Sequence, residues 1–202
     1  MRRAHRASIA TTLRTALALT AATAALVALG GCGDSRTPVP SLSQPAAPRG
    51  FRTLGFTYYG VTLIAPKNWV VLAQRAPVVT VVASGAAFVA VWRFPRAAPA
   101  PTGSAQLDQT RRELLKAVRT KYPGLVLIRA SALTVDHRSA VEIDALEQIN
   151  GRSRRVRSTH VYVPGAEYVL DEYAPPAMFH AVDHAVFSPI KRSLRLRPAA
   201  TA

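Results

Sequence analysis

The sequence predicts an α+β domain with an antiparallel β-sheet. Short β-rich runs follow one another between turn residues, two helical segments lie far apart, and one hairpin signal is very strong. Consecutive strand runs separated by helices are typical of α+β proteins, whereas regular strand and helix alternation would indicate a parallel sheet.

The first half of the domain is rich in predicted strands. Runs of β-branched and aromatic residues between Gly, Pro and Asn breaks predict strands over residues 56–59, 61–64, 69–72, 78–83 and 86–94. The last of these is long and apolar, and it forms a hairpin with its predecessor around Ser84-Gly85, so we expect it to be a central strand.

A helix is expected next, from the capping residue Ser104 to Tyr122, because Pro123-Gly124 follows directly. Apolar residues at helical spacing predict the buried stripe of this helix. They are Leu107, Leu114, Val118 and Tyr122.

The clearest local signal is the pair Asn150-Gly151, which tolerates the positive φ angles of a type I′ turn. It predicts a hairpin of strands 140–149 and 152–163. With a two-residue loop, Glu147 lies opposite Arg154 and Asp144 opposite Arg157, so charge pairing supports the register.

The end of the domain repeats the sequence of strand and helix. A strand is expected over 167–173, and Pro175-Pro176 opens a second helix. Pro189 predicts a break or restart after Phe187. Residues 193–197 predict a short closing strand, and the helix stripe is expected to consist of Phe179, Val182, Val186 and Ile190.

The N-terminus resembles a bacterial lipoprotein leader. Four arginines (Arg2, Arg3, Arg6 and Arg14) precede an uncharged, mostly apolar run over 15–29, which is a secretory signal pattern. The run is shorter than the roughly 20 residues that a membrane-spanning helix needs. We therefore expect residues 1–31 to be a cleaved signal peptide.

The residues Leu29-Gly30-Gly31-Cys32 resemble the lipobox of bacterial lipoproteins. That resemblance implies cleavage between Gly31 and Cys32 and attachment of a diacylglyceryl group to the cysteine sulfur. Cys32 is the only cysteine of the chain, so it has no disulfide partner here. The alternative is a chance cysteine behind an ordinary signal peptide. The expected location is the extracytoplasmic face of a bacterial cell membrane.

Three further regions are expected after the signal. Residues 32–50 carry the lipidated cysteine and a tether with four prolines, residues 51–198 form a single domain, and residues 199–202 are a tail. Proline-rich tethers favour an extended conformation of ~3.1 Å per residue.

The mature chain is basic. Removal of the four signal arginines lowers the formal net charge from +15 to +11. Only four of the 26 basic residues are lysine, as a genome of high G+C content would produce. Attraction to anionic lipids or cell-wall phosphates is the functional alternative. Nucleic acid is not an expected partner, because the basic residues are not interleaved with aromatic ones.

A candidate contact surface lies on the predicted 152–163 strand. Its residues are Arg152, Arg154, Arg155 and Arg157. Strand alternation sends Arg155 and Arg157 to one face and Arg152 and Arg154 to the other. These residues either bind a protein or anionic envelope component or form a solvated strand.

Catalytic motifs are weak. His180 and His184 lie four residues apart, as in helical zinc sites, and the order resembles an inverted metalloprotease motif with Asp183 in place of its glutamate. No third ligand follows in the sequence. His137, in an expected turn beside Asp136, and His160 are interpreted as local hydrogen-bonding residues. The sequence has no serine-nucleophile elbow and no phosphate-binding glycine loop.

Several aromatic residues either line a ligand pocket or belong to the core. They are Tyr58, Tyr59, Trp69, Trp92 and Tyr162.

Taken together, residues 51–197 resemble the PsbP-like superfamily, including actinobacterial lipoproteins of the LpqN/LpqT kind. The resemblance rests on Gly55-Phe56, on a strand ending in Pro66-Lys67-Asn68-Trp69, and on a closing Phe187, Ile190 and Ser193-Leu194. It implies a twisted antiparallel sheet with flanking helices and a binding or assembly accessory. It brings no catalytic motif.

The leading hypothesis is therefore a lipid-anchored accessory protein, not an enzyme, without a cofactor or metal. It would bind a protein or an anionic component of the envelope. Two alternatives remain: a zinc-dependent hydrolase that uses His180 and His184, and a carrier of a small apolar ligand.

Overall fold

Ten strands form two antiparallel sheets in the computed structural model, which describes residues 43–73 and 75–197. All of these residues belong to the second of two units, Val39–Ala202. The expected signal peptide, the lipobox with Cys32 and the expected tail lie outside the described residues. The prediction of an α+β fold with an antiparallel sheet flanked by helices is confirmed.

The smaller sheet has the order β1-β2-β10, in which β1 spans Phe51–Phe56, β2 spans Val61–Pro66 and β10 spans Arg195–Leu196. The strand expected over 56–59 was wrong: Thr57–Tyr59 form a 3₁₀ turn, η1. Gly60 ends this turn with a φ of 66°, in the left-handed region that glycine reaches at little cost. The sequence pattern misplaced the strand because two tyrosines continue the aromatic run beyond Phe56.

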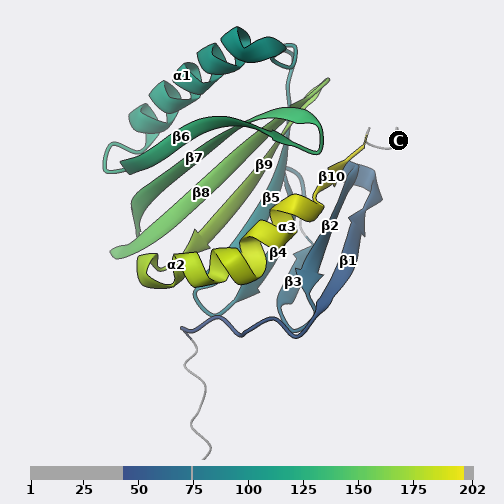
Figure 1. The fold of residues 1–202 in the computed structure, drawn as a ribbon, viewed down its shortest axis with the longest axis vertical. Helices are drawn as coiled ribbons and strands as arrows, with labels where there is room; N and C mark the ends of the chain where they lie inside the picture. Colours follow the sequence, from purple (N-terminus) through teal and green to yellow (C-terminus); the bar gives the residue numbers. More distant parts are fainter. Residues whose placement is uncertain (1–42, 74, 198–202) are drawn as a thin grey trace, which may run out of the picture. The chain divides into compact units, whose positions relative to one another are not determined.

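The larger sheet contains seven strands, all paired antiparallel (Figure 1). In spatial order they are β3 (Val70–Ala73), β4 (Val78–Ser84), β5 (Ala87–Pro95), β9 (Ala166–Ala174), β8 (Arg152–Val163), β7 (Arg138–Ile149) and β6 (Val126–Val135). The predicted β7–β8 register is confirmed, with Glu147 opposite Arg154 and Asp144 opposite Arg157. The edge strand β6 was not predicted.

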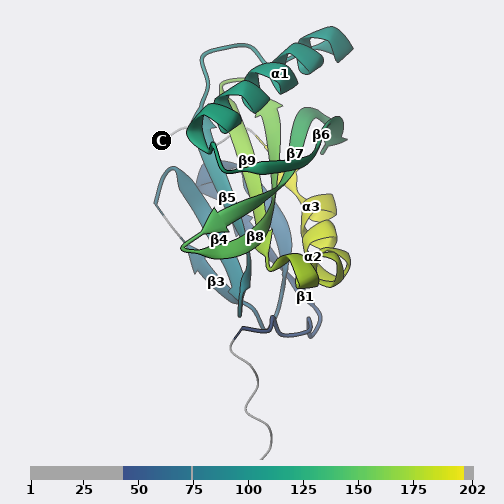
Figure 2. The same ribbon diagram turned by 90° about the vertical axis from the view of Figure 1, so that its left-hand side faces the viewer.

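The helix α1, Gly103–Lys121, covers one face of the larger sheet at its β6 and β7 end (Figures 1 and 2). The predicted stripe residues Leu107, Leu114 and Val118 pack against Val141, Ile143 and Tyr162 of the sheet. The helix begins one residue before the expected cap. Its N-cap is Thr102, whose N–H donates to Oε1 of Gln106 at 2.8 Å.

The opposite face is covered by the C-terminal helical segment and by the smaller sheet (Figure 1). This segment consists of α2 (Pro176–Val182), a π-helical turn η2 (Asp183–Phe187) and α3 (Ser188–Ser193). The four predicted stripe residues and Phe187 are all buried. The expected restart after Phe187 is confirmed, because a new α-helix starts at Ser188 with Pro189 in its first turn. No helix within the described residues has the length and hydropathy to cross a bilayer.

The last residues of the expected tether are bonded to the domain. The indole N–H of Trp69 donates to the carbonyl of Ala46, and the N–H of Ala46 donates to Oγ of Ser84, both at 2.9 Å. Gly85 permits this approach, since a Cβ atom there would lie 2.6 Å from the carbonyl oxygen of Gln44. Residues 43–50 therefore follow the surface of the domain rather than serving as a free spacer.

Candidate functional site

A cavity of about 450 Å³ lies between the C-terminal half of α1 and the larger sheet. It exists because α1 packs chiefly against β6 and β7, so the helix does not seal the face formed by β5, β8 and β9. Small-molecule sites occupy roughly 300 to 1,000 Å³, and the cavity falls within that range.

The walls of the cavity are mainly apolar and aromatic. Trp92 and Phe94 of β5 stack in parallel, with ring centroids 6.3 Å apart. Tyr173 contributes from β9 and Tyr122 from the end of α1. The aliphatic lining residues are Leu114, Ala117, Val118, Leu125, Ile143, Ala145, Val156 and Val169. Such a lining fits a ligand with an apolar body.

The polar groups of the cavity gather around Asp171, on the central strand β9. Strand pairing places Ser158 directly beside it, and the Ser158 hydroxyl donates to Oδ1 of Asp171. Burial raises the pKa of Asp171, although this hydrogen bond opposes the rise. The indole N–H of Trp92 is close enough to Asp171 to lower that pKa, but it lacks a hydrogen bond of good geometry within the described residues.

Two further ionisable groups lie toward the end of α1. Glu147 of β7 has a raised pKa because of burial and of repulsion from Asp171. The exposed ammonium of Lys121 lies 5.1 Å from the ring centroid of Tyr122. His160 also lines the cavity, and its Nδ1 lies 2.6 Å from Oε1 of Glu167.

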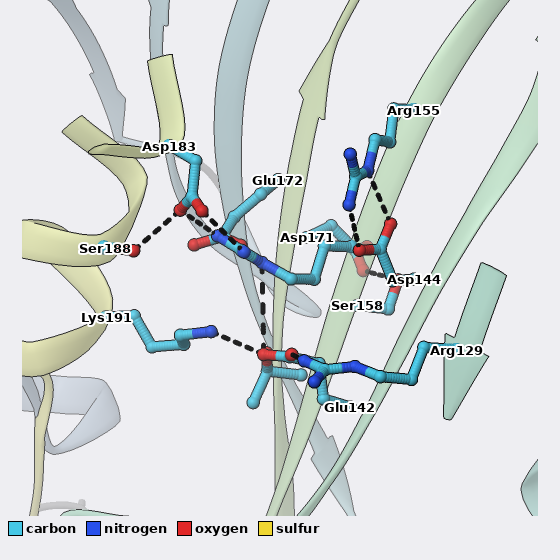
Figure 3. A network of polar contacts seen from close by, with 12 residues as sticks. Arg129, Glu142, Asp144, Arg155, Ser158, Asp171, Glu172, Asp183, Ser188 and Lys191 are labelled. Carbon is cyan, nitrogen blue, oxygen red and sulfur yellow. Dashed lines mark hydrogen bonds and ion pairs between the residues drawn. The ribbon is translucent and has the colours of Figure 1, made fainter. Parts of the chain in front are cut away.

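The opposite face of the sheet carries a buried ion network, in which Figure 3 labels Glu142, Glu172 and Asp183. Its central cation is Arg157, which is 7% exposed. Its guanidinium donates to Glu172 on β9 and to both carboxylate oxygens of Asp183 on η2. Glu142 on β7 lies 3.9 Å away. Burial lowers the pKa of Arg157, but the hydrogen bonds and charges of Asp183 and Glu172 outweigh burial and raise that pKa well above its ordinary value.

The carboxylates of this network differ in their proton affinity. Burial raises the pKa of Glu172 to about 7, although Arg157 lowers it, and Oε1 of Glu172 has no hydrogen-bond partner within the described residues. For Glu142 burial acts upward too, but the hydrogen bond from Lys191 and the charge of Arg157 hold its pKa below the ordinary value. Arg157 and Ser188 likewise hold the pKa of Asp183 low.

The four arginines expected as a contact surface are divided by the fold. Arg155 and Arg157 share one face, as alternation predicted, but that face is covered by α2. Arg155 donates to both oxygens of Asp144, at 2.9 and 2.6 Å, and stacks on Phe179. Arg157 is buried and is therefore not a surface residue, which corrects its place in the expected patch. Only exposed Arg152 and half-buried Arg154 remain on the other face.

The histidine pair lies on the outer side of the C-terminal helical segment. His180 and His184 are both exposed. Asp183, which stands in place of the glutamate of this motif, accepts hydrogen bonds from Arg157 and Ser188. Within the described residues, no group of three or more His, Cys, Asp or Glu side chains is placed to hold a metal ion. His137 lies in the two-residue turn between β6 and β7, as expected.

Of the five aromatic candidates, only Trp92 lines the cavity. Trp69 and Tyr162 are buried core residues, Tyr59 packs against the core, and Tyr58 is 64% exposed. Sequence reasoning missed Asp171, Glu147 and Ser158. Their alternation within strands was visible, but which face would remain hollow depends on where α1 packs.

Comparison with solved structures finds this architecture in known proteins. Cyanobacterial PsbP, CyanoP, from Synechocystis sp. PCC 6803 is 15% identical, with a TM-score of 0.55 over 84% of this chain and 99% of that one. LpqN of Mycobacterium tuberculosis, described as involved in cell envelope biogenesis, is 16% identical, with a TM-score of 0.51 over 74% and 91%. No protein-family model matches the sequence, and neither does any curated protein.

The shared features are those described above: a twisted antiparallel sheet and flanking helices. The resemblance predicted from strand ends and helix positions is confirmed at the level of the fold. The described residues therefore have an α+β fold shared with CyanoP and LpqN.

Proposed function

We propose that this chain is a lipid-anchored protein of the extracytoplasmic face of a bacterial membrane that binds a small, largely apolar ligand and does not catalyse a reaction. The observation that carries the proposal is the cavity beneath α1, with its apolar walls and a few polar groups at its floor. A cavity with convergent polar groups favours ligand binding. It moves the carrier hypothesis ahead of protein docking.

The proposed location rests on the leader and on Cys32. More than one acyl chain is needed for stable anchoring, and the modification implied by the lipobox supplies at least two. Since residues 43–50 follow the domain, the spacer is limited to residues 33–42, which reach about 30 Å when extended. The fold neighbour LpqN is described as an envelope biogenesis protein, and an envelope location here is consistent with it.

Extraction of the purified protein tests the binding proposal. We expect organic extraction of the chain purified from its host to release a small molecule in near-stoichiometric amount, identified by mass spectrometry. The matched variant is Ala117→Trp, which places a large side chain at an exposed cavity-lining position and should lose the molecule. Equal recovery from both proteins, or none from either, would contradict the proposal.

Intact-mass measurement tests the anchor. We expect the mature protein to begin at Cys32 with a diacylglyceryl mass added, and the Cys32→Ser variant to leave the membrane fraction. An unmodified Cys32 thiol on the native protein would contradict the proposed membrane location, but it would not bear on ligand binding in the cavity.

A second candidate function is docking to an anionic envelope surface, favoured by the position of Arg152 and Arg154 at the β7–β8 hairpin end. The test is sedimentation with vesicles containing anionic lipid, where each surface cation contributes about 1 kcal/mol. We expect Arg152→Glu plus Arg154→Glu to abolish salt-sensitive binding. The matched control is Arg112→Glu plus Arg119→Glu, which reverses two exposed charges on α1. An equal loss of vesicle binding in this control would show that net charge, and not the position of Arg152 and Arg154, causes binding.

The remaining alternative, a zinc hydrolase, is tested by metal analysis of the purified chain. We expect less zinc than protein by a wide margin, and no change on His180→Ala. Stoichiometric zinc that this variant loses would restore the hydrolase.

A further inference from the structure

The cavity lining is acidic, although the protein as a whole is basic. The mature chain has a formal net charge of +11, yet the cavity lining contains two carboxylates, Asp171 and Glu147, and one fully exposed ammonium, Lys121. The histidine of the lining, His160, contacts Glu167. The interior of the cavity is therefore a local acidic site.

Cationic groups act on the two cavity carboxylates only from a distance: the charge of Lys121 lowers the pKa of both, and that of His160 lowers the pKa of Asp171. On the opposite face, Asp144, Glu142, Glu172 and Asp183 each contact at least one Lys or Arg side chain. Within the described residues, neither Asp171 nor Glu147 forms an ion pair. Buried charges are normally paired. Arg154 lies opposite Glu147 in the strand pairing but forms no ion pair with it, and Lys121 is exposed, so within the described residues neither cavity carboxylate has a close cation.

The aromatic lining suits a particular kind of cation. Trp92, Phe94, Tyr122 and Tyr173 all border the cavity, and the faces of such rings attract organic cations, quaternary ammonium groups above all. A divalent metal ion fits poorly, because calcium takes six to eight oxygen ligands and the two carboxylates stand among apolar side chains.

We infer that the cavity beneath α1 binds an amphipathic organic cation, with its ammonium group between Asp171 and Glu147 and its apolar body against Trp92 and the aliphatic wall. This inference rests on the proposed ligand-binding function and adds the chemical class of the ligand. Lys121, at the open end, disfavours a second cationic group on the ligand there.

Three eight-carbon probes of different charge test the inference: octyltrimethylammonium, 1-octanol and octanoate. Titration calorimetry at pH 7.5 with the folded domain gives a dissociation constant for each. We expect octyltrimethylammonium to bind about tenfold tighter than 1-octanol, since a partly desolvated ring contact and an opposite charge each favour the cation. Octanoate should bind weakest.

The variants separate charge from shape. Asp171→Asn should weaken octyltrimethylammonium about tenfold while leaving 1-octanol within about twofold, since only the charge term is removed. Glu113→Gln is the matched control, because Glu113 is an exposed acid on α1 that does not line the cavity; it should change neither constant. Circular dichroism confirms that each variant is folded.

The results of these titrations distinguish failure of the cation inference from failure of the ligand-binding proposal. If 1-octanol binds, and Ala117→Trp blocks it, but the three probes bind equally or octanoate binds best, the cation inference is overturned and the ligand-binding proposal stands. If no probe binds, or Ala117→Trp changes nothing, the proposed function itself fails.

Discussion

The two faces of the larger sheet bury polar side chains in opposite ways. On the face covered by the C-terminal helical segment, Arg157 and its carboxylate partners form a network of ion pairs beside the main hydrophobic core. On the face under α1, Asp171 borders a cavity, and its one hydrogen-bond partner among the residues that the structure describes is the Ser158 hydroxyl. Both faces are served by the same strands, because alternate residues of β7, β8 and β9 point to opposite sides.

This difference distinguishes buried polar side chains that stabilise the fold from buried polar side chains that could contact a ligand. A buried charge whose partners all belong to the chain adds to the definition of the fold, and removal of one partner is costly. A buried carboxyl without a cation lowers stability, and such a cost is typical of functional sites. We therefore expect Arg157 to stabilise the fold, whereas Asp171 is the carboxyl that we propose contacts a ligand.

The largest expected effect comes from Arg157→Met. Loss of the guanidinium leaves Glu172 and Asp183 without their buried cation, so the free energy of unfolding should fall by about 3 to 5 kcal/mol. Urea denaturation followed by circular dichroism measures this loss. Arg152→Met, the same change at an exposed position of the same strand, should stay within about 0.5 kcal/mol. Equal unfolding midpoints for the two variants would show that the network is not structural.

The free energy of unfolding should also depend on pH, because Glu172 belongs to the Arg157 network. The pKa of Glu172 is raised to about 7 in the folded chain, so the folded state holds this proton more tightly than the unfolded state. Its contribution is present below pH ~4.5 and is lost as the pH rises through 7. Relative to Glu172→Gln, the native chain should lose on the order of 2 to 3 kcal/mol between pH 4.5 and 7.5.

Denaturation of both proteins at intervals across that range provides the measurement. Glu142 and Asp183 have lowered pKa values, so their contributions are lost at more acidic pH and do not overlap with the window. A constant difference between the two proteins would contradict the assigned direction.

The smallest effect is expected at Asp171. Asp171→Asn removes a buried carboxyl whose pKa burial raises, so the stability at pH 7 should stay equal or increase by up to about 1 kcal/mol. Asp144→Asn is the matched change on the other face, where Arg155 would lose a two-point ion pair. It should cost about 1 to 3 kcal/mol. Similar losses of unfolding free energy in the two variants would contradict the proposed difference between the two faces of the sheet.

Local signals in the sequence predicted much of the fold. Asn150 and Gly151 fixed one hairpin and its register, because both residues adopt positive φ angles, and Pro189 indicated the helix restart. The edge strand β6 was missed because its burial does not alternate cleanly. The boundary of the tether was also misjudged, since the bonds of Trp69 and Ser84 to Ala46 join residues distant in sequence.

The candidate site was less accessible to prediction. Trp92 was named as a pocket candidate, but Asp171 and Glu147 resemble ordinary polar residues of half-exposed strands. Their shared face follows from pairing between strands, and the hollow follows from the position of α1 near β6 and β7. The ion-pair partner expected for Arg157 from the strand register also differs from the partners that it has in the structure. Register placed Asp144 opposite Arg157, but Asp144 pairs diagonally with Arg155.

The two tryptophans of the chain allow the most direct test of the central claim that the face under α1 is the binding face. Trp92 lines the cavity, whereas the indole N–H of Trp69 is bonded to Ala46 elsewhere in the domain. In a ¹H–¹⁵N spectrum titrated with 1-octanol, we expect the Trp92 indole signal to shift and saturate while the Trp69 signal stays fixed. Saturable shifts confined to Trp69 or to the amides of α2 and α3, with Trp92 unmoved, would contradict the account.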